Sequence, residues 1–276
     1  MPGTLYVVST PIGNLGDMTP RALEVLKSVD FVAAEDTRVA MKLLGCFGIQ
    51  KPLVSYFEHN KRARGDVILA RIAAGENCAL TTDAGTPAIS DPGAELVAQC
   101  REKGIPVVTV PGACAAVAAF SLAGLRGARF TFEGFLSVSK PSRRAHLQSL
   151  VNETRPMIFY EAPHKLRATL ADFRDTFGED RVLFIARELT KLHEESFRTT
   201  IGGAIERYEQ TEPRGEYVLI VAGGSEPETP PVDAVAAARA RVAEGMSPSE
   251  AARVTSRETN MPRNAIYKAL LEDTEL

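Results

Sequence analysis

Four short segments rich in small and acidic residues are the parts of this sequence best suited to hold a ligand. Each follows an apolar run, and together they are residues 10–17, 83–91, 111–116 and 160–164. In open α/β sheets ligands bind at such strand ends, where small residues leave backbone groups within reach. The four segments suit a nucleoside-type ligand held by backbone and apolar contacts, and their acids favour a ligand with a positive centre. For any one segment, a βα connection without a ligand is the alternative.

The usual motifs for phosphate binding and hydrolysis are absent. No G-x-G-x-x-G follows the first strand-like run, and no G-x-x-x-x-G-K-[ST], G-x-S-x-G or H-E-x-x-H occurs. The four histidines, His59, His146, His164 and His193, show no ligand spacing. These absences argue against a dehydrogenase, a serine hydrolase and a metalloenzyme, and no metal site is expected.

Composition indicates an ordinary globular chain. The 276 residues are 45% hydrophobic and 24% charged, with a net charge of −3, so any contact with RNA would use local basic patches. Four scattered cysteines without a C-x-x-C pair predict free thiols in a reducing compartment, the cytoplasm. No signal peptide is expected before the first strand-like run. The uncharged run 105–125 is broken by Pro106 and Pro111, which favours a buried helix over a membrane span.

Strands and helices alternate in the first half of the chain. Thr19-Pro20 and Asp91-Pro92 each pair a capping side chain with a proline suited to the first helical position. This alternation predicts right-handed βαβ crossovers and a parallel sheet. The predicted strands are 5–8, 30–34, 53–57, 78–82 and 107–110. Helices are predicted over 19–28, up to about 46, within 59–74, over 91–104 and after 112.

The second half has fewer helices between its strands, which predicts a mixed sheet. Strands are predicted over 130–136, 157–160, 181–189, 195–201 and 216–221. An apolar stripe at helical spacing follows the second of these strands; it comprises Leu166, Leu170, Phe173 and Phe177.

Beyond residue 224 the sequence predicts a linker and three short helices. The helices cover 233–244, a segment opened by the capping box Ser247–Glu250, and 262–271. They resemble a helix-turn-helix module, with a helical tail packed on the body as the alternative. The fold class is therefore α/β, with an N-terminal domain over 1–126, a C-terminal α/β domain over 127–224, a linker over 225–232 and a helical module over 233–276.

Six runs of the sequence are distinctive in order and spacing. They are STPIGNLGDMTPRALEVL (9–26), AAEDTR (33–38), TTDAGTPAISDPG (81–93), VPGACAA (110–116), FYEAPHKL (159–166) and ARELTKLHEE (186–195). Over residues 4 to about 224 the chain resembles the small-subunit ribosomal RNA 2′-O-methyltransferases of the RsmI type, within the tetrapyrrole methylase superfamily. The C-terminal helical module resembles the one that closes this family.

The resemblance implies a tetrapyrrole-methylase-like fold of two α/β domains, with S-adenosyl-L-methionine bound between them in a homodimer. It implies that the substrate is a cytidine ribose in the decoding centre of 16S rRNA, within the 30S ribosomal subunit. The family's methyl-donor site corresponds here to Pro11, Asp83, Gly85, Thr86, Ile89, Ala115, Ala116, Tyr160, Glu161, Ala162, Gly215 and Ala222.

Two turns depart from the wider superfamily. Tetrapyrrole methylases carry G-P-G after the first strand and G-D-P at the fourth, whereas this chain has Pro11-Ile12-Gly13 and Asp83-Ala84-Gly85. The difference argues against a corrin or porphyrin substrate. A small-molecule methylase of the corrin type, and a catalytically inactive RNA-binding or ribosome-assembly module of the same fold, are the alternatives. The unobstructed loop at 83–89 argues against the inactive module.

Methyl transfer to a ribose hydroxyl needs a base, because the 2′-OH is a weak acid. The candidates at the mouths of the strands are Glu35, Asp36, Glu161, Glu188, Lys191 and Glu194, with Asp36, Glu188 and Lys191 as first choices. The alternative for the acids at 35–36 is a helix N-terminus whose dipole they meet. The alternative for Arg187-Glu188 is a surface ion pair. Asp83 is expected to shape the donor pocket.

Basic clusters are the expected contacts to RNA phosphates, which position an RNA without reading its sequence. The clusters are Lys61, Arg62 and Arg64, and Lys140, Arg143 and Arg144; Arg253, Arg257, Arg263 and Lys268 form a third group in the helical module. A solvated charged face is the alternative for each cluster. The sequence leaves open whether the substrate is naked rRNA or the assembled particle.

Overall fold

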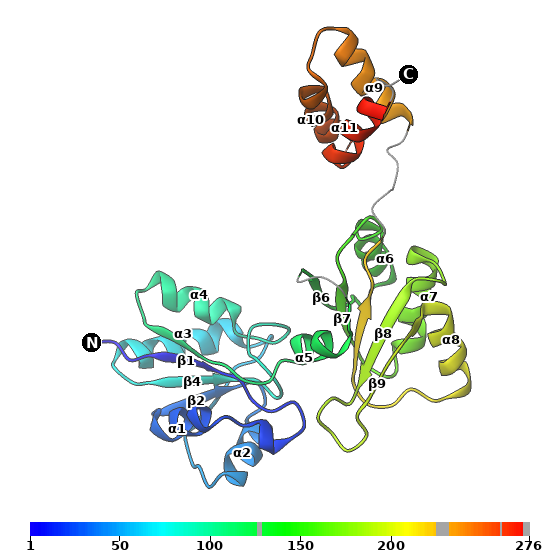
Figure 1. Cartoon of the computed structure of the whole chain (residues 1–276). Helices are drawn as coiled ribbons and strands as arrows, with labels where there is room; N and C mark the ends of the chain where they lie inside the picture. Colours follow the sequence, from blue (N-terminus) through cyan, green and yellow to red (C-terminus); the bar gives the residue numbers. More distant parts are fainter. Residues whose placement is uncertain (126–128, 225–231, 260, 273–276) are drawn as a thin grey trace. The chain divides into compact units, whose positions relative to one another are not determined.

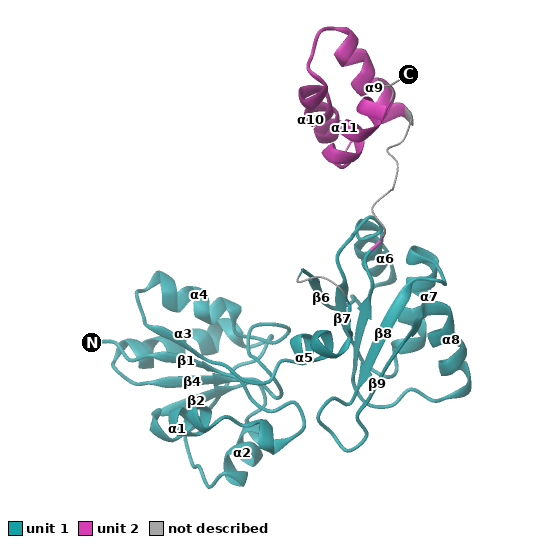
Figure 2. Ribbon diagram, in the orientation of Figure 1, with its two compact units in different colours: residues 1–223 teal, residues 224–276 magenta. Residues whose placement is uncertain are grey.

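The computed structural model of the protein describes residues 1–125, 129–224, 232–259 and 261–272 (Figure 1). The chain divides into two compact units, residues 1–223 and 224–276 (Figure 2). The predicted linker lies outside the described residues except at its last position, where α9 begins. The bounds of the predicted α/β domains stay a prediction, although the first unit holds two separate sheets.

The N-terminal half of the first unit forms a parallel five-stranded sheet, as the strand and helix alternation predicted. Its strand order is β3-β2-β4-β1-β5, so the carboxyl ends of all five strands lie at one edge. The strands are β1 (Leu5–Val8), β2 (Phe31–Ala34), β3 (Leu53–Ser55), β4 (Cys78–Thr81) and β5 (Val107–Val110).

Helices cover both faces of this sheet (Figure 1). Val32 packs in a core with residues of α1 (Pro20–Ser28) and α2 (Thr37–Cys46). Its neighbour Ala33 points to the other face, in a core with residues of α3 (Lys61–Ala73) and α4 (Ala94–Glu102). Because successive side chains of a strand alternate between faces, both faces are apolar and the strands read as continuous apolar runs.

The start of α4 differs from the prediction. The helix begins at Ala94 after Gly93, so Asp91 is not its N-cap and Pro92 is not its first residue. Gly93 has φ +148°, and an added Cβ would lie 3.0 Å from Leu80 Cδ2, so the chain turns there in a conformation that glycine alone adopts easily. The loop after β4 is therefore longer, and Asp91 belongs to it. At α1 the cap prediction is confirmed, because Thr19 accepts from the Ala22 N–H at 3.2 Å.

The second sheet is mixed, as predicted. Its order is β6-β7-β10-β8-β9, with β6 parallel to β7 and the other pairs antiparallel. Its strands are β6 (Thr131–Phe135), β7 (Met157–Glu161), β8 (Val182–Arg187), β9 (Glu195–Thr200) and β10 (Tyr217–Val221).

One face of the second sheet packs on α6 (Lys140–Ser149), α7 (Leu166–Phe177) and α8 (Ile201–Gln210). The apolar stripe predicted for α7 is buried in this core. Helices α6 and α8 were missed; the first was interpreted only as a basic segment. The opposite face packs on α5 (Ala115–Leu122), which follows the last strand of the first sheet. Helix α5 thereby fixes the loops of the first sheet beside the second sheet.

The second unit is a three-helix module of α9 (Val232–Ala243), α10 (Pro248–Thr259) and α11 (Arg263–Glu272). Its small core includes Ala238, Ala251 and Ile266. Ser247 Oγ accepts from the Glu250 N–H at 3.3 Å, which is the first half of the predicted capping box. None of the described helices combines the length and the apolar character needed to cross a bilayer.

Candidate active site

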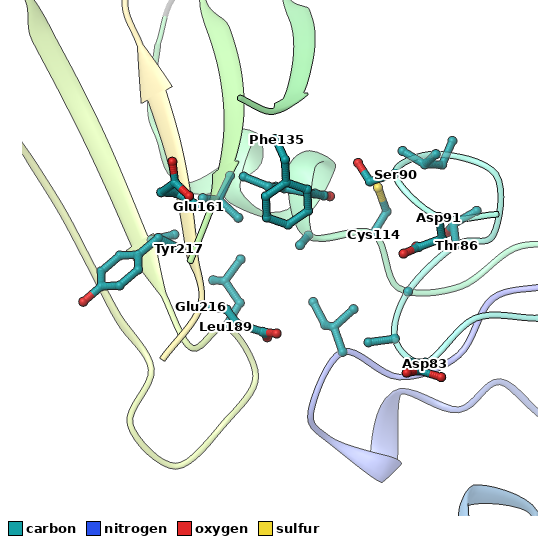
Figure 3. A pocket seen from close by; sticks show the side chains of 18 of the residues that line it. Asp83, Thr86, Ser90, Asp91, Cys114, Phe135, Glu161, Leu189, Glu216 and Tyr217 are labelled. Carbon is teal, nitrogen blue, oxygen red and sulfur yellow. The ribbon is translucent and has the colours of Figure 1, made fainter. Parts of the chain in front are cut away.

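A cavity of about 340 Å³ lies within the first unit, between loops of its two sheets (Figure 3). That volume is within the range of small-molecule sites. One wall comes from the carboxyl-end loops of the parallel sheet and includes Ile12, Glu35, Asp83, Gly85, Thr86, Ile89, Asp91 and Cys114. The other wall comes from the second sheet and includes Phe135, Tyr160, Ala162, Glu188, Leu189, Lys191, Glu216, Tyr217 and Val218.

Backbone pairing fixes the loops of the first wall. Thr10 and Gly85 form an isolated antiparallel bridge, with N···O distances of 2.8 and 3.1 Å. Thr86 Oγ1 lies 2.9 Å from Ser9 Oγ and donates to the Ala113 carbonyl at 3.0 Å. Gly85 has φ +83°, and an added Cβ would lie 3.3 Å from Ile12 Cγ2. The loops after β1, β4 and β5 are therefore held together, and any side chain at Gly85 would enter the space beside Ile12.

Three carboxylic acids, Glu35, Asp83 and Asp91, line the first wall. Thr82 Oγ1 donates to Glu35 Oε2 at 2.7 Å, and the Asp36 N–H donates to Asp83 Oδ1 at 3.1 Å. Burial raises the pKa of Asp83. Burial, and then the charge of Glu35, raise the pKa of Asp91 to about 6. Asp91 is thus a carboxyl group that changes charge close to neutral pH.

Tyr160 and Glu161 anchor the second wall. Tyr160 Oη accepts from the Ala116 N–H at 3.0 Å, and burial raises the pKa of its phenol. The Tyr160 ring meets Phe135 nearly edge-on, at 5.5 Å between centroids. Glu161 is buried, and its carboxylate accepts from Thr169 Oγ1 at 2.5 Å and from the Ala162 N–H at 2.8 Å. Its carboxylate is therefore engaged in fixing the end of β7.

Lys191 sits in an ion-paired network on the same wall. Its Nζ donates to Glu188 Oε1 at 2.8 Å and to Glu216 Oε2 at 2.9 Å. Burial alone would lower the pKa of Lys191, but these hydrogen bonds outweigh it and the pKa is raised. Burial would likewise raise the pKa of Glu188, but Lys191 and the Glu216 N–H outweigh it and the pKa is lowered. Both groups are held in their charged forms.

Backbone strain accompanies this network. Glu188 and Thr190 have φ values of +51° and +69°, which side-chain-bearing residues rarely adopt. Gly13, in the loop after β1, lies against the network, because an added Cβ there would lie only 2.4 Å from Lys191 Cγ. The loop after β1 therefore packs against the lysine stem.

Most of the residues predicted for the donor site line this cavity. These are Asp83, Gly85, Thr86, Ile89, Ala115, Tyr160, Glu161 and Ala162. Pro11, Ala116, Gly215 and Ala222 are not among its lining residues. Ala116 contributes its N–H to Tyr160, and Gly215 lines a second cavity. Ala222 follows β10 at the end opposite Tyr217 and Val218, the β10 residues that line the cavity.

The three first-choice candidates for the base also differ in whether they line the cavity. Glu188 and Lys191 line the cavity, whereas Asp36 does not. Asp36 caps α2 by accepting from the Arg38 N–H at 2.8 Å. The Arg38 side chain binds the same carboxylate, and this hydrogen bond is the main cause that lowers the pKa of Asp36 to about 2. So low a pKa makes Asp36 a weak proton acceptor.

Several cavity residues were missed by sequence reasoning. Asp91 is the last residue of the predicted ligand segment 83–91, but the sequence favours a helix-cap role for it because a proline follows, so it was not among the predicted site residues. Phe135, Leu189 and Tyr217 are apolar residues next to strand ends that lie far apart in the sequence. Nothing local in the sequence marks them, because the strand order of the second sheet brings them together.

The predicted basic clusters differ in how far their charges are already paired. Lys61 Nζ lies 2.8 Å from Glu58 and 3.5 Å from Glu95, whereas Arg62 and Arg64 are exposed. Arg144 and Lys140 are exposed on α6, although Arg144 Nε also lies 3.9 Å from Asp172 Oδ1. Arg143 instead binds Asp172 Oδ2 through Nε at 2.6 Å, and the two side chains are only 16% and 9% exposed.

Replacing Arg143 by alanine is expected to destabilise the protein. The change leaves the Asp172 carboxylate buried with its main partner gone, and breaking such a pair costs about 3 kcal/mol. Denaturant unfolding of the full chain measures this loss. Arg144→Ala is the matched control, because that side chain is 60% exposed. Equal stability of the two variants would contradict a structural role for Arg143.

Comparison with known proteins decides the family. A family model described as tetrapyrrole (corrin/porphyrin) methylases matches residues 4–205, and one described as the RsmI C-terminal HTH domain matches residues 228–274. The ribosomal RNA small subunit methyltransferase I of a Synechocystis species is 48% identical over 98% of both chains. The protein of the same name from Pseudomonas aeruginosa is 45% identical over 98% of this chain and 97% of its own. The chain belongs to the ribosomal RNA small subunit methyltransferase I family.

Two solved methyltransferase structures have the same fold as most of this chain. A cobalt precorrin-4 methyltransferase superposes with a TM-score of 0.59 over 79% of this chain and 94% of its own, at 17% identity. The uroporphyrin-III-C-methyltransferase of Thermus thermophilus superposes with a TM-score of 0.58 over 80% of this chain and 94% of its own, at 20% identity. At these identities the likeness shows a tetrapyrrole-methylase fold, as the sequence resemblance implied.

Proposed function

We propose that this methyltransferase transfers the methyl group of S-adenosyl-L-methionine to the 2′-hydroxyl of a cytidine ribose in the decoding centre of 16S rRNA. The observation that supports the proposal is the acid-lined cavity between the two sheets. Membership of a family whose curated members carry an rRNA methyltransferase name supports the substrate class. A 30S particle as substrate would place the enzyme in the cytoplasm, and the resemblance implies a homodimer.

The cavity has the chemistry that S-adenosylmethionine needs. Apolar side chains such as Ile12, Phe135 and Val218 suit its adenine, and the tight turn at Gly85 leaves backbone groups accessible. The three acids of the first wall suit the positive ammonium group of the cofactor; of the described lining residues, only Lys191 carries positive charge. When bound, the cofactor supplies an activated methyl carbon, so the protein's main task is alignment of the acceptor.

We propose Gly85, Thr86, Ala115, Tyr160 and Ala162 as the residues that hold the donor, with Asp83 shaping the pocket. Each lines the cavity, and the pairing of Thr10 with Gly85 fixes the loop that carries the first two. An acid in contact with the sulfonium would stabilise the ground state more than the transition state, in which that positive charge is lost. The acids are therefore better suited to bind the amino-acid end of the donor and to contact the acceptor hydroxyl.

We place the proton-accepting role on Asp91. It lines the cavity, is half-buried beside Glu35, and has a pKa raised to about 6, near the range in which a general base works best. Glu188 and Lys191 stay candidates by position. However, their ion pair lowers the pKa of Glu188 and raises the pKa of Lys191, which stays protonated and cannot accept a proton, so we assign both to holding the loop after β8.

Replacing Lys140 and Arg144 together by alanine is expected to weaken binding to 30S subunits. Both cations are exposed, and each RNA phosphate that they no longer neutralise should reduce the slope of log K against log[salt] by about 0.7 to 0.9. Filter binding over a salt series measures the slope. An unchanged slope would remove this helix from the RNA-binding surface. The pair is preferable to Arg143, whose replacement would also destabilise the fold.

One labelling experiment separates the proposal from its alternatives. The protein is incubated with methyl-labelled S-adenosylmethionine and either unmethylated 30S subunits or free tetrapyrroles, and the label is located. Label on a ribose of the ribosomal RNA supports the proposal, and label on a macrocycle supports a corrin-type methylase. Absence of label on either substrate, with intact donor binding, supports an inactive RNA-binding module.

A further inference from the structure

A second cavity, of about 500 Å³, lies beside the candidate active site. It is formed where β8 ends, where β9 begins and where α8 connects to β10. Its lining includes Arg187, His193 and Arg214 together with Glu188 and Glu212. Glu188 lines both cavities, so the two cavities are adjacent at this residue.

The acids of the second cavity already have cationic partners. Glu188 Oε1 binds Lys191 Nζ at 2.8 Å and the Glu216 N–H at 2.9 Å. Glu212 binds Arg167, which also donates to the Tyr208 carbonyl at the end of α8. Neither Lys191 nor Arg167 lines the second cavity. The negative charges there are thus neutralised from outside the cavity.

The cations of this cavity are not balanced in the same way. Arg187 Nη2 donates to the His193 carbonyl at 3.4 Å, but Arg187 Nε is buried and has no hydrogen-bond partner among the described residues. The Nε lies 3.8 Å from a Glu195 carboxylate oxygen, and Arg207 already binds that carboxylate. The Arg214 and His193 side chains are exposed and have no ion pair within the described part of the chain. A buried guanidinium N–H without a partner favours an anionic acceptor from outside the protein.

We propose that this second cavity binds a backbone phosphate of the acceptor RNA, held by Arg187 and Arg214. The inference rests on the proposed function, because an RNA strand whose ribose enters the first cavity carries phosphates on both sides of that ribose. A phosphate on the far side of Glu188 would fix the strand's register and so aim one hydroxyl at the donor. Guanidinium groups suit this task because they bind phosphate with two parallel hydrogen bonds.

The test uses the full chain and the variants Arg187→Gln and Arg214→Gln. With unmethylated 30S subunits, each variant is expected to raise KM about tenfold, since it removes a charge-assisted hydrogen bond. Each should also reduce the slope of log K against log[salt] by about 0.7. The affinity for S-adenosylmethionine, measured by calorimetry, is expected to stay unchanged. Arg174→Gln is the control, because it removes a cation of α7 that lines neither cavity.

An unchanged KM and salt slope in Arg214→Gln would overturn the proposal, and so would an equal change in Arg174→Gln. Because the Arg214 side chain is exposed, its replacement should leave the protein folded, so Arg214→Gln can be measured even if Arg187→Gln is unstable. Calorimetric binding of inorganic phosphate, combined with an unchanged KM for 30S subunits, would also contradict an RNA site. If wild-type protein transfers no methyl group to 30S subunits but its binding slope still depends on Arg214, the proposed function fails and the phosphate site stands.

Discussion

Replacing Gly85 by valine is expected to abolish measurable binding of S-adenosylmethionine. Gly85 has φ +83°, which a β-branched residue does not adopt without strain. A Cβ there would lie 3.3 Å from Ile12 Cγ2 and 3.7 Å from the Ala113 carbonyl oxygen, so the valine methyl groups must fill space at the cavity wall. A loss of donor affinity of at least about 100-fold, or 2.7 kcal/mol, is expected in calorimetry.

Gly104→Val is the matched control for this change. Gly104 also has a positive φ, of +66°, but an added Cβ meets no atom within 4 Å, and the residue does not line the cavity. Both variants should lose stability through backbone strain, whereas only Gly85→Val should lose donor binding. Normal donor affinity in a folded Gly85→Val protein would remove the loop after β4 from the donor site.

Replacing Asp91 by asparagine is expected to lower the single-turnover rate constant about 100-fold while donor affinity stays close to wild type. Positioned bases typically contribute this much to a rate. Asparagine keeps the size of the side chain but cannot accept the proton of a hydroxyl. Single-turnover methyl transfer to 30S subunits measures the loss. Asp180→Asn, which removes an exposed carboxylate that does not line the cavity, should retain the wild-type rate.

The pH profile gives an independent check on Asp91. A base works only when deprotonated, and the pKa of Asp91 is about 6. The single-turnover rate should therefore fall about tenfold per pH unit below pH 6 and level off above about pH 7. In Asp91→Asn the single-turnover rate should no longer fall in this way below pH 6. Weakened donor binding with an unchanged rate constant would instead make Asp91 a donor-binding residue.

The parallel sheet was predictable because its signals are local. Thr19-Pro20 caps α1 as the sequence indicated, and alternating strands and helices dictate parallel pairing. The same local logic failed at Asp91-Pro92. There α4 begins two residues later than predicted, after Gly93 with its φ of +148°. Asp91 therefore stays in the loop, where it lines the cavity. Helix α6 was missed because its first turn is mostly basic and polar, so it shows no apolar stripe.

The site was predictable only where the chain carries small residues or a family motif. Asp83, Gly85 and Thr86 stand in one recognisable loop, and all three line the cavity. Phe135 and Tyr217 come from two strands separated by about eighty residues of sequence, and only the pairing of β6, β7 and β10 brings them to one wall. The sequence also did not reveal the ion pairs. Asp36 was therefore predicted as a base although Arg38 binds it, and Arg143 was predicted to bind RNA although Asp172 binds it.

The most direct test of the proposed function is nucleoside analysis of 16S rRNA after the reaction. Unmethylated 30S subunits are incubated with the protein and labelled S-adenosylmethionine, the rRNA is digested, and the labelled nucleoside is identified and mapped. We predict one labelled product, 2′-O-methylcytidine, located in the decoding centre. Label on a base, on another ribose, or on no nucleoside while calorimetry shows donor binding would contradict the proposed function.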